Sequence, residues 1–208
     1  MRVKICGLMN EEAAQFAARH GADAIGFVFA KSKREISTEK AFQIISKLPK
    51  DIKKVGVFVN PSKERIDEVV SAAGINMVQL HGEETPEFCQ TIPYPVIKAF
   101  SIESASDLEK IHEYPCEYVL LDGPKGKNYH GGNGISFEWN MLSNFDFKGK
   151  KVILAGGLTP QNVTAAIKEA NPYMVDVSSG VETEGQKDLM KIKVFLSSVK
   201  DVQLTDQI

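Results

Sequence analysis

The sequence predicts an α/β fold, a single (β/α)8 TIM barrel of parallel strands and outer helices that covers residues 1–208. Three observations favour this fold. Short β-rich runs alternate with amphipathic segments along the chain, without a linker or a second domain. The runs are apolar on both faces, as in a parallel sheet covered by helices. Eight such units in 208 residues come to about 26 residues each.

The strands are predicted where β-branched and aliphatic residues cluster between turn-forming residues. Several of these runs end directly in a polar or reactive residue followed by glycine, as in Cys6-Gly7 and Asp122-Gly123. In chain order, the predicted strands are residues 2–6, 24–29, 54–59, 76–81, 95–100, 117–122, 151–155 and 173–178.

The helices are predicted from apolar residues at i, i+3, i+4 and i+7, which form one stripe that can pack on the sheet. Such stripes are Ala41, Ile44, Ile45 and Leu48; Ile66, Val69, Val70 and Ala73; and Val163, Ala166, Ile167 and Ala170. Asn60-Pro61 and Thr159-Pro160 each predict an N-cap followed by a first-turn proline. His20-Gly21 and Ala73-Gly74 predict helix ends. The polar tail from Val202 to Ile208 is expected to fray.

An open, doubly wound sheet is the competing architecture. Its dinucleotide-binding form needs a glycine fingerprint after the first strand, where this chain has Cys6-Gly7-Leu8-Met9. The absence of that fingerprint and the count of eight similar units favour the closed barrel.

Composition excludes several classes of function. A net charge of −2 and a pI near 6.1 argue against a general binder of nucleic acids or membrane surfaces. No apolar run reaches the roughly 20 residues of a membrane helix, and no secretory signal is visible at the N-terminus.

The three cysteines form no CxxC pair, so we expect neither disulfides nor a zinc site. This use of cysteine predicts a location in the reducing cytoplasm. Cys89 and Cys116 are interpreted as packing residues.

Chemistry is expected at the carboxyl ends of the strands, where barrel enzymes place their active sites. Cys6 ends the first strand, and its thiolate could be a base or a nucleophile, although a buried packing role is the alternative. Asp122 ends the sixth strand and could be an acid or base, or a helix cap or ion-pair partner. His81 follows the fourth strand, but no second histidine stands at a strand end, so no metal site is expected.

Two glycine-containing turns predict a phosphate site. Gly156 and Gly157 follow the seventh strand, and Ser179 and Gly180 follow the eighth. The loops after these two strands commonly bind phosphate through backbone N–H groups.

Other polar residues are placed near this site by strand parity. Lys4, Gln79 and Asp176 share parity with strand-end residues, so we expect them to point into the barrel and pair with one another or with water. Arg34, in the charged loop after the second strand, has a guanidinium that suits a substrate carboxylate.

Together these motifs resemble the phosphoribosylanthranilate isomerase family over nearly the whole chain. The resemblance rests on Val3-Lys4-Ile5-Cys6-Gly7, Gly26-Phe27-Val28-Phe29 with Ser32-Lys33-Arg34, Val78-Gln79-Leu80-His81-Gly82, Leu120-Leu121-Asp122, Leu154-Ala155-Gly156-Gly157-Leu158 and Val175-Asp176-Val177-Ser178-Ser179-Gly180-Val181-Glu182.

The resemblance implies a cofactor-free Amadori rearrangement in tryptophan biosynthesis. Asp122 is the implied general acid and Cys6 the implied general base. Arg34 is implied to bind the anthranilate carboxylate, and Asp176 its amine or the ribose. Gln79 and His81 are expected to contact substrate, and Gly156, Gly157, Ser179 and Gly180 to bind its phosphate. The glycine-rich loop 123–134 matches less firmly and is interpreted as a lid.

Rivals of two classes are weighed against this function: another phosphosugar barrel enzyme and a non-catalytic barrel. The related histidine-pathway isomerase has an aspartate where this chain has Cys6, and ribulose-phosphate epimerase needs a His/Asp metal cluster. A non-catalytic barrel that binds a phosphorylated ligand is disfavoured because both Cys6 and Asp122 are present. No exposed apolar stripe stands out, so a monomer is expected, with a small phosphosugar as its partner.

Overall fold

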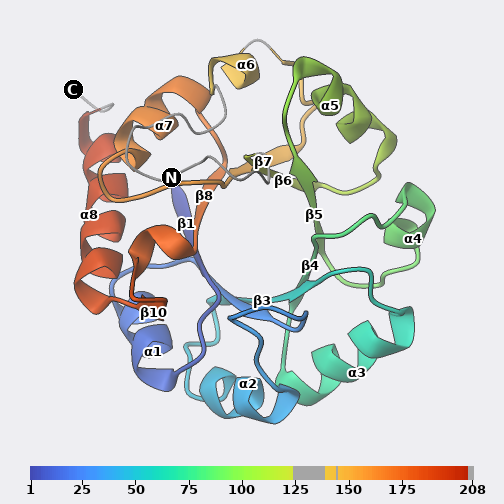
Figure 1. The fold of residues 1–208 in the computed structure, drawn as a ribbon, viewed down its shortest axis with the longest axis vertical. Coiled ribbons are helices and arrows are strands. Elements are labelled where there is room, and N and C mark those ends of the chain that lie inside the picture. The colour runs from blue at the N-terminus through green and yellow to red at the C-terminus, as the bar shows by residue number, and fades with distance from the viewer. Residues whose placement is uncertain (124–138, 144, 206–208) are drawn as a thin grey trace.

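The computed structural model describes residues 1–123, 139–143 and 145–205, and these form a closed barrel of eight parallel strands in sequence order. Figure 1 shows the strands as a ring surrounded by the helices. The first and last strands pair, with Lys4 beside Asp176 in the register. The strands are β1 (Arg2–Cys6), β2 (Ala24–Val28), β3 (Lys53–Phe58), β4 (Met77–Leu80), β5 (Val96–Ser101), β6 (Tyr118–Asp122), β7 (Lys151–Leu154) and β8 (Met174–Val177).

Every predicted strand is confirmed, and each of its ends lies within one residue of the observed end. The helices are α1 (Glu11–Arg19), α2 (Thr38–Ile45), α3 (Lys63–Ala73), α4 (Pro86–Gln90), α5 (Ala105–Glu109), α6 (Asn140–Ser143), α7 (Val163–Ala170) and α8 (Leu189–Thr205). Two 3-10 turns, η1 (Lys110–Glu113) and η2 (Ser179–Val181), and a small antiparallel pair, β9 (Glu182–Thr183) and β10 (Gln186–Lys187), complete the described elements.

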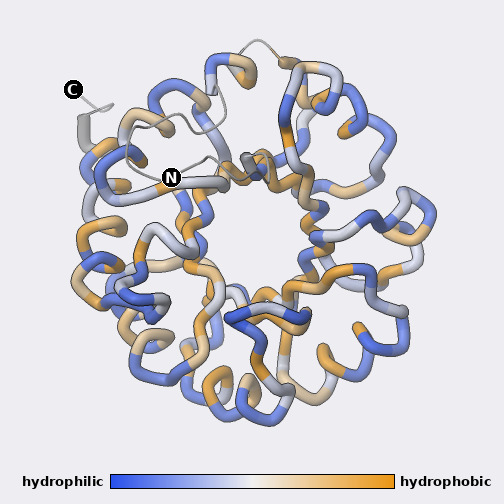
Figure 2. Tube along the Cα trace, in the orientation of Figure 1, coloured by the Kyte–Doolittle hydropathy of each residue, from blue (hydrophilic) through white to orange (hydrophobic). Residues whose placement is uncertain are grey.

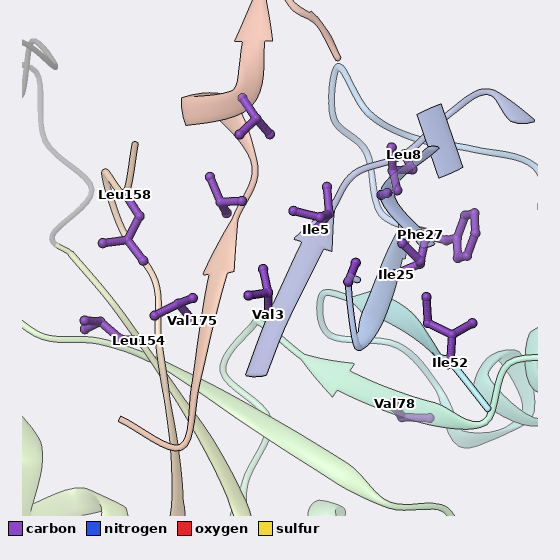
Figure 3. Close-up of a cluster of buried hydrophobic side chains, with 14 of the residues drawn as sticks. Val3, Ile5, Leu8, Ile25, Phe27, Ile52, Val78, Leu154, Leu158 and Val175 are labelled. Atoms are coloured by element: carbon purple, nitrogen blue, oxygen red, sulfur yellow. The ribbon is translucent and has the colours of Figure 1, made fainter. Parts of the chain in front are cut away.

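Strand parity divides the apolar core into two parts. Val3, Ile5 and Val175 point outward and pack with Leu158 and other residues beneath the helices (Figure 3). The inward residues form a second cluster that fills the barrel: Ala24, Val55, Met77, Ile97, Ala99, Leu120, Ile153, Ala155 and Met174. Figure 2 shows apolar residues along the strands and polar residues on the outer faces of the helices.

Two predicted helix starts are wrong. The N-cap of α3 is Ser62, whose hydroxyl accepts from the Arg65 N–H at 3.2 Å, and not Asn60. Asn60 instead has a left-handed backbone (φ 48°) and its side chain binds the following loop. Helix α7 begins at Val163, after Asn162, and Thr159-Pro160 lies in the preceding turn.

Two of the predicted C-terminal helix ends are confirmed, and the predicted frayed tail differs from the structure. Gly74 caps α3 in the left-handed conformation, and α1 ends at Arg19 with His20 as its C-cap. Helix α8 extends through Thr205 with Val202 buried, whereas the sequence predicts a frayed tail from Val202. None of the helices in the described ranges is both long and apolar enough to cross a membrane.

The cap assignment can be tested by substitution. Ser62→Ala removes the acceptor of an otherwise unpaired N–H and should lower the free energy of unfolding by about 1 kcal/mol, as N-cap losses do. Ser71→Ala, at an exposed position within the same helix, is the matched control and should leave the urea midpoint almost unchanged. Equal midpoints for both variants would contradict the cap at Ser62.

Candidate active site

The polar strand ends predicted from the sequence meet at one mouth of the barrel. Cys6 and Asp122 are the last residues of β1 and β6, and His81 and Gly156 lie just beyond β4 and β7. Because all eight strands are parallel, their carboxyl ends face the same opening (Figure 1). The structure therefore brings together residues that are widely separated in sequence.

One side of the mouth holds a row of three polar side chains. The Gln79 amide nitrogen lies 3.0 Å from His81 Nδ1, and His81 Nε2 lies 3.5 Å from Asp122 Oδ2. If the amide donates to Nδ1, the ring proton is on Nε2 and faces the carboxylate; this assignment follows from the hydrogen-bond pattern. Gln79 is buried, whereas the side chains of His81 and Asp122 are 24% and 30% exposed. The reactive end of the row is thus open to a ligand.

The opposite side holds Cys6 above a buried ion pair. Lys4 Nζ donates to Asp176 Oδ2 at 2.8 Å, and both side chains are buried. Burial raises the pKa of the Cys6 thiol above its ordinary value, and the neighbouring Lys4 ammonium offsets part of that rise. Desolvation acts to lower the pKa of Lys4, but Asp176 and Cys6 outweigh it and raise the pKa. The expected inward pairing of Lys4 with Asp176 is confirmed.

A second charge cluster frames the thiol. Arg34 donates through Nε and Nη2 to the two oxygens of Glu182, both at 2.7 Å, and Lys187 Nζ lies 2.6 Å from Glu182 Oε1. Lys187 also donates to the Ser178 carbonyl at 2.8 Å, and the Ser178 hydroxyl donates to the Cys6 carbonyl at 3.1 Å. This network ties the loop after β2 to the loop after β8.

The pKa values in this cluster follow from pairing and burial. The hydrogen bonds to Glu182 raise the pKa of Arg34. Burial alone would raise the pKa of Glu182, but Arg34 and Lys187 outweigh it and lower the pKa. Desolvation lowers the pKa of Lys187 despite its carboxylate partner. Neither Glu182 nor Lys187 was selected as a site residue from the sequence, although Glu182 ends one of the motifs that carry the family resemblance and Lys187 follows in the polar hairpin after Val181.

The predicted phosphate loops lie against each other. Gly156 and Gly157 both have positive φ, and a Cβ on Gly180 would lie 1.8 Å from the Leu158 carbonyl oxygen. Asn162 fixes the first loop, since its side chain accepts from the Thr159 N–H at 2.7 Å and donates to the Gly157 carbonyl at 2.9 Å. Ser179 and Gly180 begin η2, and the first N–H groups of a helical turn have no partner within it. These N–H groups are available to an anion.

The mouth adjoins these loops directly. A Cβ on Gly156 would lie 2.8 Å from Asp122 Oδ1, so the carboxylate and the glycine turn are in contact distance. Of the glycine-rich loop 123–134, only Gly123 lies within the described residues. Within the described part of the chain, no group of three or more His, Cys, Asp or Glu side chains could hold a metal ion.

The arrangement can therefore move protons between two sides of one ligand. It offers a thiol on one strand end, a carboxyl group with a histidine partner on another, and an anion site beside the carboxyl group. Its guanidinium is held in place at the rim.

Comparison with known proteins matches one family of isomerases over nearly the whole chain. The family model for N-(5′-phosphoribosyl)anthranilate isomerase matches residues 3–198. The chain is 49% identical over 202 residues to N-(5′-phosphoribosyl)anthranilate isomerase of Bacillus cereus (strain G9842), covering 97% of this chain and 98% of that protein.

Two solved structures are similar across the whole fold. Phosphoribosyl anthranilate isomerase from Thermotoga maritima superposes with a TM-score of 0.88 at 45% identity, covering 97% of this chain and 99% of that one. A structure of such an isomerase in complex with reduced 1-(o-carboxyphenylamino)-1-deoxyribulose 5-phosphate has a TM-score of 0.85 at 42% identity, with the same coverage.

The environment of Cys6 predicts how its thiol ionises. Because burial raises its pKa and Lys4 opposes that rise, Lys4→Met should shift the pH dependence of Cys6 alkylation by iodoacetamide to higher pH. Peptide mapping by mass spectrometry follows Cys6 separately from Cys89 and Cys116. An unchanged or lower alkylation midpoint in the variant would refute the stabilising effect of Lys4 on the thiolate.

Proposed function

Because the chain belongs to the N-(5′-phosphoribosyl)anthranilate isomerase family, it is an isomerase of tryptophan biosynthesis, and we propose that Cys6 and Asp122 are its base and acid. The reaction converts N-(5′-phosphoribosyl)anthranilate to 1-(2-carboxyphenylamino)-1-deoxyribulose 5-phosphate. One observation supports the assignment above all: a thiol and a carboxyl group end two separate strands at the same barrel mouth.

The first proposed step opens the ribose ring. Asp122 gives its proton to the ring oxygen, the C1′–O bond breaks, and the nitrogen lone pair forms a cationic Schiff base. The Asp122 carboxylate left behind lies 3.5 Å from His81 Nε2. A ring N–H there stabilises the negative charge as it develops, which is where such a donor accelerates a reaction.

The second step removes the proton from C2′. The Cys6 thiolate takes this proton, and the C–H electron pair forms the C1′–C2′ double bond of an enolamine while the nitrogen becomes neutral. The cationic Schiff base makes the C2′ proton more acidic. Its positive charge also favours the thiolate form of Cys6 over the thiol. The enolamine then gains a proton at C1′ and loses one from the C2′ hydroxyl, which yields the aminoketose. These steps use side chains of the protein alone.

Substrate orientation is assigned to the charged rim. Glu182 occupies Nε and Nη2 of Arg34, which fixes the guanidinium and leaves its Nη1 donors for the anthranilate carboxylate. Asp176 Oδ1 is buried without a hydrogen-bond partner among the described residues, so it can accept from the anthranilate amine or a ribose hydroxyl. Gln79 and His81 are assigned to the ribose side of the substrate.

The phosphate is assigned to the two glycine turns. Backbone N–H groups of Gly156, Gly157, Ser179 and Gly180 would bind its oxygens, and the close packing of the two loops keeps these groups together.

We further propose that the enzyme is monomeric and cytoplasmic. Four large apolar side chains of the described residues are exposed: Met190 and Val194 form a short pair on α8, whereas Phe42 lies on α2 and Val59 follows β3, so they form no extended apolar surface. Sedimentation velocity tests the monomer.

Removing either proposed catalytic group should stop the chemistry without preventing binding. Cys6→Ser and Asp122→Asn should each lower kcat by about 10²- to 10⁴-fold, the range for a lost general acid or base. The loss of anthranilate fluorescence, with substrate generated in situ, measures turnover. Cys89→Ala and Asp146→Asn, at positions away from the mouth, are the matched controls. Wild-type turnover in both active-site variants, with product still bound, would exclude this mechanism.

The carboxylate role of Arg34 predicts a different kinetic effect. Arg34→Ala should raise KM about 10- to 100-fold with a smaller change in kcat, because a charged hydrogen-bonding pair contributes roughly 1.5–3 kcal/mol. Lys33→Ala, at the exposed neighbouring position, should leave KM unchanged. An unchanged KM for Arg34→Ala would remove this residue from carboxylate binding.

A further inference from the structure

A buried ion pair outside the barrel interior has no role in the proposed chemistry. Lys98 Nζ lies 3.1 Å from Glu84 Oε2, and the two side chains are 3% and 2% exposed. Lys98 is the outward-facing residue between Ile97 and Ala99 of β5, which both point into the barrel. A buried pair of this kind is weak as a source of stability, because desolvation consumes most of its Coulomb energy. Its contacts indicate another purpose.

Both charges of the pair bind the backbone of one residue, Gly82. Lys98 Nζ donates to the Gly82 carbonyl at 2.7 Å, and the Gly82 N–H donates to Glu84 Oε2 at 2.9 Å. Gly82 directly follows His81, the residue that faces Asp122. The pair therefore holds the two peptide groups that flank the Gly82 α-carbon, and the first of these joins Gly82 to His81.

Further bonds attach the same loop to the turn after β3 and to the end of η1. Glu84 Oε1 accepts from the Asn60 N–H at 2.8 Å, and Asn60 Oδ1 accepts from the Glu83 N–H at 2.7 Å. The Tyr114 hydroxyl donates to the Glu84 carbonyl at 3.1 Å. A Cβ on Gly82 would lie 2.3 Å from Asn60 Oδ1, so the loop is packed tightly against Asn60.

The Lys98 ammonium is itself fully compensated. Besides Glu84 and Gly82 it donates to the Ala99 carbonyl at 3.1 Å, and it lies 5.5 Å and 5.8 Å from the ring centres of Phe100 and Tyr114. These rings pack edge to face, 5.0 Å apart. Carbonyl oxygens, a carboxylate and two aromatic faces hold the charge in one place. The ammonium can thus serve as a fixed anchor for the loop.

The geometry at the mouth is sensitive to this anchor. The separation of 3.5 Å between His81 Nε2 and Asp122 Oδ2 is at the long limit of a hydrogen bond. A small outward movement of the His81–Gly82 peptide would break the contact, whereas a small inward movement on ligand binding would shorten it.

We propose that Glu84 and Lys98 are positioning residues that hold His81 against Asp122 from the outer side of the barrel, and so set the rate of ring opening. This inference rests on the proposed role of Asp122 as general acid. Neither residue touches the substrate, since both lie beneath the loop on the helix side of the sheet. Their effect on catalysis passes through His81.

The variants Glu84→Gln and Glu83→Gln form a matched test. Gln keeps the shape of Glu84 but removes the charge that pairs with Lys98, whereas Glu83 is exposed and its bond to Asn60 uses only the backbone. Glu84→Gln should lower kcat about 10-fold or more with KM changed less than about twofold, because misplacement of a catalytic group mainly affects the chemical step. Glu83→Gln should match the wild type in both constants.

A double-mutant cycle identifies the route of the effect. In a His81→Asn background, Glu84→Gln should cause little further loss, because residues that act through one another are not additive. In a Cys6→Ser background, where removal of the C2′ proton limits turnover, the loss should appear in the rate of ring opening and not in kcat. Lys98→Met combined with Glu84→Gln removes both charges, which avoids an uncompensated buried ammonium if Glu84→Gln alone does not fold, and it should show the same loss of kcat.

A wild-type kcat in folded Glu84→Gln, or an equal loss in the His81→Asn background, would overturn the positioning role. The ring nitrogen chemical shifts of His81, measured by NMR in the ligand-free protein, show whether Glu84 positions His81 even if Asp122 is not the general acid. If Asp122→Asn retained wild-type turnover while Glu84→Gln still altered those shifts, the mechanism would be wrong and the structural link to His81 would remain.

Discussion

The buried ion pair between Lys4 and Asp176 joins the first strand of the barrel to the last. It lies where β1 and β8 close the sheet, and it places an ammonium group beside the Cys6 thiol. Loss of one partner from a buried pair typically costs about 3–5 kcal/mol, because the other charge is left uncompensated. Closure of the fold and the ionisation of its proposed base therefore depend on the same two side chains.

The remaining charges at the mouth are arranged in the same manner. Arg34 and Lys187 share the Glu182 carboxylate, and His81 faces Asp122. Each reactive group has a charged or hydrogen-bonding neighbour that holds its position. An anionic substrate with a carboxylate at one end and a phosphate at the other suits such a mouth, because Arg34 and the glycine turns lie on different loops around it.

Local sequence patterns predicted much of this structure. The apolar runs and their parity placed all eight strands and the inward direction of Lys4, Gln79 and Asp176, since side chains alternate across a strand. The strand-end positions of Cys6 and Asp122 followed from the general architecture of parallel barrels.

What the sequence could not provide were contacts between distant segments. Asn60 and Ser62 both have the chemistry of an N-cap, and the choice of Ser62 depends on the use of Asn60 by the loop at Glu83. Lys187 stands in a polar hairpin that resembles a solvated turn, and only the fold brings it to Ser178. Lys98 interrupts an apolar strand, but its partner Glu84 lies in a loop whose path is set by tertiary packing.

The central claim is that Asp122 and Cys6 serve successive steps, and single-turnover kinetics with substrate deuterated at C2′ test it most directly. Cys6→Ser should show the full primary isotope effect, because removal of the C2′ proton then limits the rate. Asp122→Asn should show almost none, because ring opening then limits the rate and breaks no C2′–H bond. Equal isotope effects in the two variants would contradict the division of roles.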